Sequence, residues 1–553
     1  MLCRSALTRG SQLAARQAGV QKLAQRGFAA AAAAAPKSSY EPTTIAGVKV
    51  AARDDNGPTT RLAVVAKAGT RYEPLPGLTV GLEEYAFKNT NKRSALRIVR
   101  ESELLGGQLT SYHTREALVL QASFLREDLP YFAELLAEVV SQTRYTSHEF
   151  HEEVENVIHQ KQAKLDAAAI ALDAAHAVAF HTGLGAPLYP TPSTPVSSYL
   201  NEHSVAAFAE AAYTKPNIAI VADGASSAGL SKWIEPFFKD VPAASDAAVK
   251  SAPSKYFGGE QRIALTGGNS LVIAFPGAAQ GAKQPETAVL AALLGGQSSI
   301  KWSPGFSLLA KAAASTFGAT AKASHLAYSD AGLLAIQITG QAAAVRKVAE
   351  ESVKALKSVA EGGVTQEDLV KAIAKAKFNL LSAGEVAGSA LAQTGSQLIH
   401  AGELVKVAEA VSALEGVTAE KLQAAAKTLL EGKASVAAVG DLHVLPFAED
   451  LGLRRNPPST QPSQTGTAVP ALTAAKMTFA WKAAGLTYNR YLAVASRAVR
   501  NALKEDKRLA AERRNRQELR FAKWTNGKQG EIQNLADANV AAAVESAAAG
   551  GTA

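Results

Sequence analysis

The chain has 553 residues, a length typical of roughly two to four domains. Its apolar fraction of 47% and charged fraction of 19% are those of a folded globular protein, and no apolar run is long enough to span a membrane. The net charge of +9 comes from the two ends of the chain, so the basic pI is no argument for nucleic-acid binding by the nearly neutral body.

Residues 1–28 carry five basic residues among Ser, Ala, Gln and Leu, and no acidic residue precedes Glu41. This composition resembles a mitochondrial transit peptide. Its end, Arg26-Gly27-Phe28-Ala29, is similar to sites cut by the matrix processing peptidase, so we expect residues 1–28 to be removed between Phe28 and Ala29. Cys3 is the only cysteine, and the mature chain would therefore have no disulfide, thiolate ligand or cysteine nucleophile.

Residues 69–90, GTRYEPLPGLTVGLEEYAFKNT, have the outline of a zinc-peptidase helix whose ligands are altered. Such a helix carries H-x-x-E-H, in which two histidines one turn apart hold zinc and the glutamate activates a water. Val80, Glu83 and Glu84 stand at these positions. Glu83 keeps the general base, but Val80 has no lone pair and Glu84 puts a carboxylate where an imidazole belongs. We therefore expect neither a metal nor another cofactor here, and no catalytic residue.

The residues around this helix resemble the mitochondrial processing peptidase family, which is pitrilysin-like. The resemblance rests on G-T-R-Y-E in front and E-x-Y-A-F-K-N-T-N-K-R-S behind. It implies a third zinc ligand, a glutamate, from a later helix. In this chain that helix is VENVIHQKQAKL, which supplies Gln160 and Lys161 near the expected place, while Glu155 comes more than one turn too early. The family's metal site is therefore altered at every ligand position.

A second candidate metal motif is His151-Glu152-Glu153-Val154-Glu155, which lacks the last histidine of H-E-x-x-H. A zinc site needs three or four converging ligands. We therefore expect His148, His151 and His159 to lie on a solvated helix face.

The body of the chain repeats one order of predicted elements at a spacing of about 217 residues. In the first half we predict strands over Ala117–Leu125 and Asn217–Ala222, and helices over Leu129–Val140, from near Ser147, and over Ala167–Ala179. In the second half we predict strands over Leu333–Thr339 and Ser435–Val439, a helix over Ala343–Val359, and a helix capped by Thr365 with Leu369, Ile373 and Leu380 on its apolar face.

This mixture of strands and amphipathic helices predicts an α+β fold, with a mixed or antiparallel sheet covered by helices on one side. The resemblance implies the same architecture, two homologous domains. We place them at residues 40–240 and 254–453, joined by a hinge over Pro242–Pro253.

The family contains zinc-bearing catalytic subunits, their glycine-loop partners, and the core proteins of ubiquinol-cytochrome c reductase, the cytochrome bc1 complex. Val80 and Glu84 argue against the first kind. The glycine-loop partner needs an uninterrupted glycine run, whereas residues 294–305, LGGQSSIKWSPG, offer two glycines and a later one.

The resemblance therefore implies a non-catalytic, cofactor-free core subunit at the matrix side of the mitochondrial inner membrane. Its implied partners are core protein 1, cytochrome b, cytochrome c1 and the iron-sulfur subunit, whose assembly it supports. Two alternatives stay open. One is the non-catalytic, substrate-binding alpha-type subunit of the processing peptidase, and the other is a divergent peptidase that uses Glu83, Glu84 and an unseen ligand.

The C-terminal part begins with residues 454–476, which are rich in Pro, Ser, Thr and Gln and predict a flexible linker. From Met477 onward the sequence resembles the mitochondrial ATP synthase epsilon subunit, through the motif residues Trp481, Gly485, Tyr488, Tyr491 and Arg500. The segment 477–553 predicts a helix from about Thr487 with a narrow apolar stripe, which needs a larger partner. The resemblance implies the gamma and delta subunits of the central stalk.

These two resemblances conflict mechanically, because a rotor subunit tied to a stationary respiratory complex would wind its tether at each turn. The linker averages roughly 25 Å end to end and reaches about 80 Å when fully stretched, so it cannot absorb continuous rotation. Met477 is the only methionine besides Met1 and stands at the start of the epsilon-like motif. We therefore expect the C-terminal segment to be released or expressed separately.

Overall fold

The computed structural model describes residues 39–192, 194, 196–243, 251–280, 284–297, 305 and 307–453. All of them lie in one compact unit, residues 1–458, and the second unit, residues 459–553, lies outside the described part. The predicted cleavage site at Phe28 and Ala29, the linker, and the epsilon-like motif residues Trp481, Gly485, Tyr488, Tyr491 and Arg500 are therefore outside the described residues. Among the described helices, none has the length and apolar character needed to cross a membrane.

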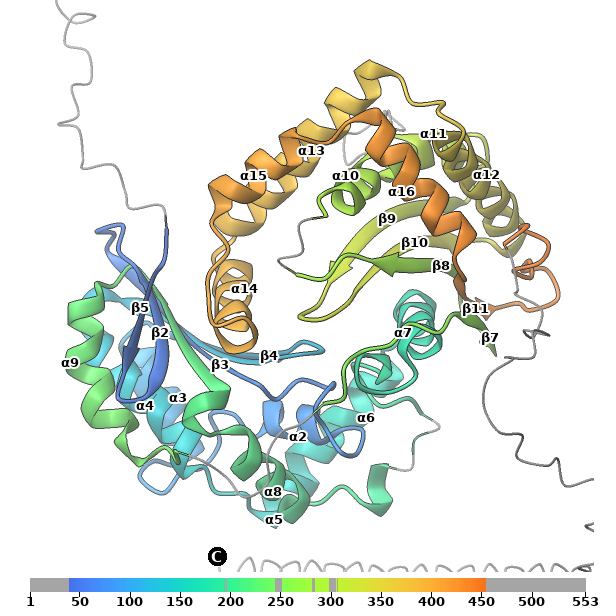
Figure 1. The fold of residues 1–553 in the computed structure, drawn as a ribbon. Helices are drawn as coiled ribbons and strands as arrows, with labels where there is room; N and C mark the ends of the chain where they lie inside the picture. The colour runs from blue at the N-terminus through green and yellow to red at the C-terminus, as the bar shows by residue number, and fades with distance from the viewer. Residues whose placement is uncertain are drawn as a thin grey trace, which may run out of the picture. The chain divides into compact units, whose positions relative to one another are not determined.

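The first half builds a six-stranded mixed sheet in the order β1-β2-β6-β3-β5-β4 (Figure 1). Its neighbours run antiparallel except β2 and β6, which are parallel. The strands are β1 (Glu41–Ile45), β2 (Val48–Arg53), β3 (Thr59–Ala66), β4 (Gln108–His113), β5 (Leu118–Leu125) and β6 (Ile218–Asp223). The main helices are α2 (Leu78–Glu84), α3 (Ala95–Leu104), α4 (Leu129–Gln142), α5 (Ser147–Glu149), α6 (Glu155–Ala163), α7 (Ala167–Phe180), α8 (Glu202–Ala212) and α9 (Ser227–Phe237).

The second half repeats this topology in a five-stranded sheet of order β7-β11-β8-β10-β9, again with one parallel pair, β7 and β11. The strands are β7 (Gly259–Ala264), β8 (Asn269–Gly277), β9 (Ala319–Ala327), β10 (Gly332–Gly340) and β11 (Ser435–Gly440). The helices are α10 (Glu286–Leu294), α11 (Leu308–Ala314), α12 (Ala342–Ala360), α13 (Gln366–Glu385), α14 (Ala387–His400), α15 (Val407–Glu415) and α16 (Ala419–Glu431). The predicted repeat and the α+β class are confirmed.

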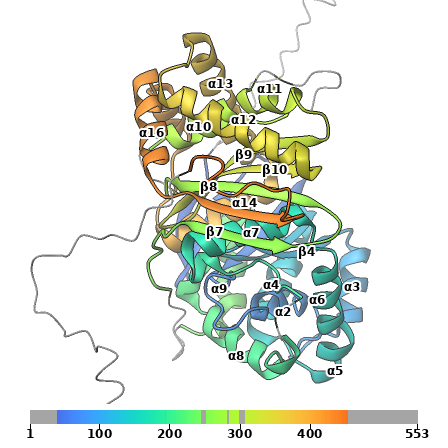
Figure 2. The same cartoon turned by 90° about the vertical axis from the view of Figure 1, so that its right-hand side faces the viewer.

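Each sheet is covered on both faces, and the second cover comes from the other half of the chain. Alternate residues of β3 point to opposite sides: Val64 joins the core formed with the first half's own helices, whereas Val65 packs with Leu391 and Leu398 of α14. Reciprocally, the alanine-rich α7 packs on β8 and β11, as Figure 2 shows. The two halves therefore exchange one helix each.

This exchange corrects the expectation of helices on one side only. A sheet buried on both faces needs near-continuous apolar strands, and all six residues of β6 and of β11 are buried. The expected burial of Leu380 was also wrong, because this side chain is exposed. The buried residues of α13 are Leu369, Ala372 and Ala376, so its buried face ends one turn before Leu380.

Close packing of α14 on the first sheet gives a direct test of the exchange. A Cβ added at Gly395 would lie 2.3 Å from a methyl carbon of Val65, whereas one added at Gly384 on α13 would meet nothing within 4 Å. Gly395→Ala is therefore expected to lower the free energy of unfolding by about 1–3 kcal/mol through overpacking. Gly384→Ala is the control and should be neutral or stabilising, because alanine favours a helix interior. Urea unfolding measures both, and equal stability of the two variants would contradict the close contact.

Candidate functional site

Helix α2 carries the altered peptidase motif and begins at a left-handed glycine. Gly77 has φ of 98°, and the Glu73 carboxylate accepts the backbone N–H groups of Gly77 at 3.2 Å and of Thr79 at 3.1 Å. The glutamate of the G-T-R-Y-E motif thus satisfies donors that a helix start leaves unpaired. The side chains from Leu78 to Glu83 are all buried, which fixes the motif against the core of the first half.

Val80 occupies the position of the first histidine and is 1% exposed within that core. Its contribution is apolar packing, and a valine side chain cannot coordinate a metal.

Glu83, the residue in the position of the general base, is enclosed by two partners. The Lys161 ammonium of α6 lies 2.9 Å from Glu83 Oε1 and 2.6 Å from Glu84 Oε1, so one cation bridges the two carboxylates. The second oxygen of Glu83 pairs with Nδ1 of His113, at the end of β4. We call Glu83, Glu84, His113 and Lys161 the α2 cluster.

The charges of the α2 cluster hold Glu83 in its ionised form. Burial alone would raise the pKa of Glu83, but the hydrogen bond and charge of His113 and those of Lys161 outweigh burial and lower it. Conversely, burial would lower the pKa of Lys161, and the two carboxylates raise it instead. Lys161 thus supplies one positive charge between the carboxylates.

The structure distinguishes Gln160 from Lys161, the two residues that the sequence placed near the position of the third ligand. Gln160 is exposed, whereas Lys161 is half-buried and reaches the carboxylates. His148, His151 and His159 are exposed, as expected, and His151 pairs with Glu155 on the helix surface at 3.1 Å. Within the described ranges, no three His, Cys, Asp or Glu side chains gather as a metal site.

His113 is the member of the α2 cluster that sequence reasoning missed. Its Nε2 lies 2.9 Å from the carbonyl oxygen of Leu188, and the ring of Tyr189 packs edge-on at 5.1 Å between centroids. No motif connects a histidine on β4 with a helix thirty residues earlier, so only the fold brings them together. With a partner at each Glu83 oxygen, the cluster forms an ion-pair network.

Of the glycine region at residues 294–305, the structure describes only part. Gly295 ends α10 with φ of 64°, and residues 298–304 lie outside the described residues. Gly295 is the end of α10, and Gly296 forms an isolated β-bridge with Lys322.

Removal of the Lys161 ammonium tests the cluster. Lys161→Met leaves Glu83 and Glu84 without their shared cation, so we expect the free energy of unfolding to fall by about 1–3 kcal/mol at neutral pH. The pKa of Glu83 is lowered by folding, so its contribution is present at neutral pH and is lost as the pH falls through the glutamate range. The difference between wild type and variant should therefore shrink on acidification.

The control for this test is Lys164→Met, since Lys164 is exposed just after the same helix. Urea unfolding at pH 7 and at pH 4 measures both variants. A loss of equal size for Lys164→Met, or a difference that grows towards pH 4, would contradict the role of Lys161.

Arg71 of the same G-T-R-Y-E motif joins the two halves. Its guanidinium lies 2.7 Å from Glu116 of the first half and 2.6 Å from Asp330 of the second half, and it also binds the Ser329 hydroxyl at 3.0 Å. The two motif residues before α2 therefore have structural roles. Glu73 caps the start of the helix, and Arg71 forms ion pairs between the two halves.

Comparisons with known proteins match both halves and the C-terminal segment. Family models match as "Insulinase (Peptidase family M16)" over residues 49–192, as "Peptidase M16 inactive domain" over residues 199–376, and as "Mitochondrial ATP synthase epsilon chain" over residues 479–527.

Three similar proteins carry the description cytochrome b-c1 complex subunit 2, mitochondrial. The Neurospora crassa protein is 75% identical over 454 residues, which is 82% of this chain and 100% of that protein. The Schizosaccharomyces pombe protein is 40% identical over 421 residues, covering 75% of this chain and 95% of the relative. The human protein is 28% identical over 424 residues, which cover 73% of this chain and 90% of the human protein.

Proposed function

We propose a structural, non-catalytic role in the mitochondrial respiratory chain for this chain, which belongs to the family of cytochrome b-c1 complex subunit 2. The observation that carries the function is the 75% identity over the whole length of the Neurospora crassa subunit. The match of residues 199–376 to an inactive peptidase domain agrees with it. The chain is a core subunit of ubiquinol-cytochrome c reductase, where it serves assembly and stability and performs no chemistry of its own.

We further propose that the peptidase site has lost its metal ligands. Val80 lies in the core, Gln160 points to solvent, and the Lys161 ammonium takes a place between Glu83 and Glu84 that a cation could otherwise fill. The half-buried Lys161 ammonium would repel a metal cation placed next to these two carboxylates. These residues do not fit zinc.

The partners that follow are the other subunits of the complex. We propose that the chain contacts core protein 1, cytochrome b, cytochrome c1 and the iron-sulfur subunit, and that it lies peripherally on the matrix side of the inner membrane. Family membership supports the complex as a whole, and the individual contacts and the matrix side are the proposal.

Copurification separates this function from the alternative. A tagged chain should bring down cytochrome b in a stoichiometric amount after detergent extraction of mitochondria. The alpha-type subunit of the processing peptidase would instead bring down a zinc-bearing peptidase subunit and no cytochrome b. Recovery of the zinc-bearing partner, or leader-peptide cleavage by the purified chain, would overturn the proposal.

For the organisation of the chain we propose a transit peptide at 1–28, homologous domains at 40–240 and 254–453, a linker at 454–476 and an epsilon-like segment at 477–553. The family match at 479–527 supports the last assignment. We propose that this segment is released or made separately and joins the gamma and delta subunits of the ATP synthase central stalk. The test is the tryptic peptide of residues 477–482, the first one of the epsilon-like segment, which should be absent from the purified respiratory complex. Its stoichiometric presence would contradict separation.

A further inference from the structure

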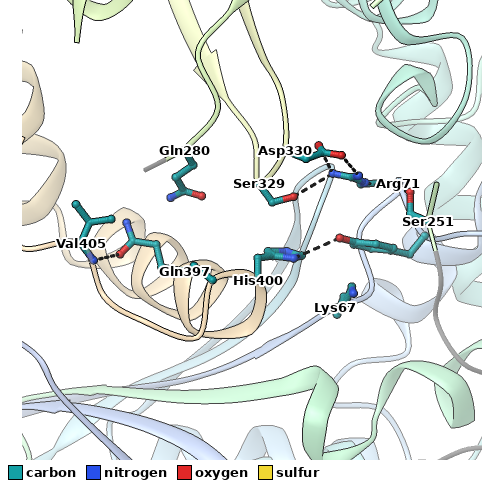
Figure 3. Close-up of a pocket in the computed structure, with 11 residues that line it drawn as sticks. Lys67, Arg71, Ser251, Gln280, Ser329, Asp330, Gln397, His400 and Val405 are labelled. Carbon is teal, nitrogen blue, oxygen red and sulfur yellow. Dashed lines mark hydrogen bonds and ion pairs between the residues drawn. The ribbon is translucent and has the colours of Figure 1, made fainter. Parts of the chain in front are cut away.

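A cavity of about 320 Å³ opens between the two halves, and none of the residues of the α2 cluster lines it (Figure 3). Lys67 and Tyr72 reach it from the first half, Gln280 enters from the chain after β8, and Gln397 and His400 come from α14. A volume near 300 Å³ suits a small molecule. The cavity is therefore large enough to be a binding site.

Lys67 is the cation of this cavity that lacks a direct counterion. Its side chain is half-buried with Nζ 5.0 Å from the ring centre of Tyr72, and no described residue forms an ion pair or hydrogen bond with Nζ. Burial lowers the pKa of Lys67, and the charge of nearby Arg71 lowers it further. An anion next to Nζ would relieve both effects.

Neutral hydrogen-bonding groups face the same space. Nε2 of His400 is buried and has no partner among the described residues, while its Nδ1 lies 3.4 Å from the Tyr72 hydroxyl. Gln397 uses its side-chain oxygen to accept the Val405 amide at 3.2 Å, which leaves its NH₂ group available. The Gln280 side chain makes no hydrogen bond within the described part of the chain. A buried polar atom without a partner is rare, which points to a ligand.

The charges define the class of ligand. Arg71 directs its guanidinium to Ser251, Glu116, Ser329 and Asp330, whereas Lys67 makes no such contact with a described residue and is therefore the cation that a ligand can reach. One ammonium fits one carboxylate, and the amide and imidazole N–H groups can donate to a second one, whereas phosphate sites gather several cations or helix N-termini. We propose that this cavity binds a small carboxylate-bearing molecule, with the carboxylate on Lys67 and the polar remainder against Gln280, Gln397 and His400.

Equilibrium binding of labelled succinate to the full chain tests this site. The wild type should bind one succinate per chain in a saturable manner, and Lys67→Gln should weaken binding at least about tenfold, because a charged hydrogen bond is lost. Gln280→Leu should also weaken it, and this variant removes no contact of the described fold. Lys427→Gln is the matched control, because Lys427 is exposed on α16 and should leave binding unchanged. Circular dichroism verifies that each variant is folded.

Three outcomes would overturn the site. They are equal succinate binding by Lys67→Gln and wild type, tighter binding of inorganic phosphate than of succinate, and binding of an acidic peptide without binding of succinate. The measurement uses the chain alone, so its failure would leave copurification with cytochrome b untouched.

Discussion

Replacement of Arg71 by methionine is expected to lower the free energy of unfolding by about 3–5 kcal/mol, because it breaks a buried ion pair. The Arg71 side chain is 5% exposed and that of its partner Glu116 is 6% exposed. Removal of one member of a buried pair leaves the other charge without compensation in a poorly solvated site. Glu116 would keep only the Ser329 backbone amide, at 2.9 Å, and the Ser329 hydroxyl, at 2.6 Å.

The matched control is Arg126→Met. Arg126 also grips a carboxylate with two nitrogens, at 2.8 and 2.7 Å from Asp54, but its side chain is 38% exposed. Exposed pairs contribute about 1 kcal/mol or less. Urea unfolding of both variants gives the comparison. The stability of Arg71→Lys should fall between those of wild type and Arg71→Met, because lysine keeps the positive charge but cannot donate two parallel hydrogen bonds as a guanidinium does. Equal losses for Arg71→Met and Arg126→Met would contradict the role of burial.

The repeat made much of the fold predictable from sequence. Short apolar runs such as residues 217–222 and 435–439 mark the strands β6 and β11, which occupy the same position in the two sheets. The helices α4, α7, α12 and α13 follow from apolar residues at helical spacing and from the Thr365 cap, whose hydroxyl accepts the amide of Asp368. Each of these signals lies within a short stretch of the chain, so a single sequence is enough to predict the elements.

The helix exchange could not be predicted, because it depends on contacts between distant segments. The sequence of α14 is that of an amphipathic helix and does not state which sheet it covers, yet it packs on β3 and β6 of the other half. The alanine pattern of α7 likewise predicts a helix and not its place on β8 and β11.

The composition of the α2 cluster also escaped prediction in part. A π-helical turn over Phe150–Val154 interrupts the helix that leads to Lys161, and such a turn changes which side chains of the following helix face inward. The spacing of residues in the sequence could not show which of these side chains faces inward. Gln160 and Lys161 were therefore equal candidates for the position of the third ligand. His113 comes from a separate strand, and its approach to Glu83 depends on how β4 and α2 pack.

Reconstruction of the zinc site is the most demanding test of the proposed degeneracy. The triple variant Val80→His, Glu84→His, Lys161→Glu is expected to bind about one zinc ion per chain, because two imidazoles one helical turn apart and a carboxylate make a three-ligand set. Zinc content after dialysis, measured by mass spectrometry, gives the stoichiometry. Val80 is buried, so the metal-free variant should be less stable than wild type, and zinc should raise its unfolding temperature while a chelator lowers it.

The control moves the third ligand by one residue. Val80→His, Glu84→His, Gln160→Glu keeps the two histidines and the charge of Lys161, but its new carboxylate starts from an exposed position. The Lys161 ammonium would remain next to Glu83 and repel the metal. Zinc bound equally by both variants would show that the Lys161 ammonium does not occupy the position that the zinc ion takes. Zinc bound by the first variant alone would mean that the Lys161 ammonium supplies the positive charge that a metal ion supplies in an active peptidase. In this way the peptidase-like fold would keep its ion pairs without a metal.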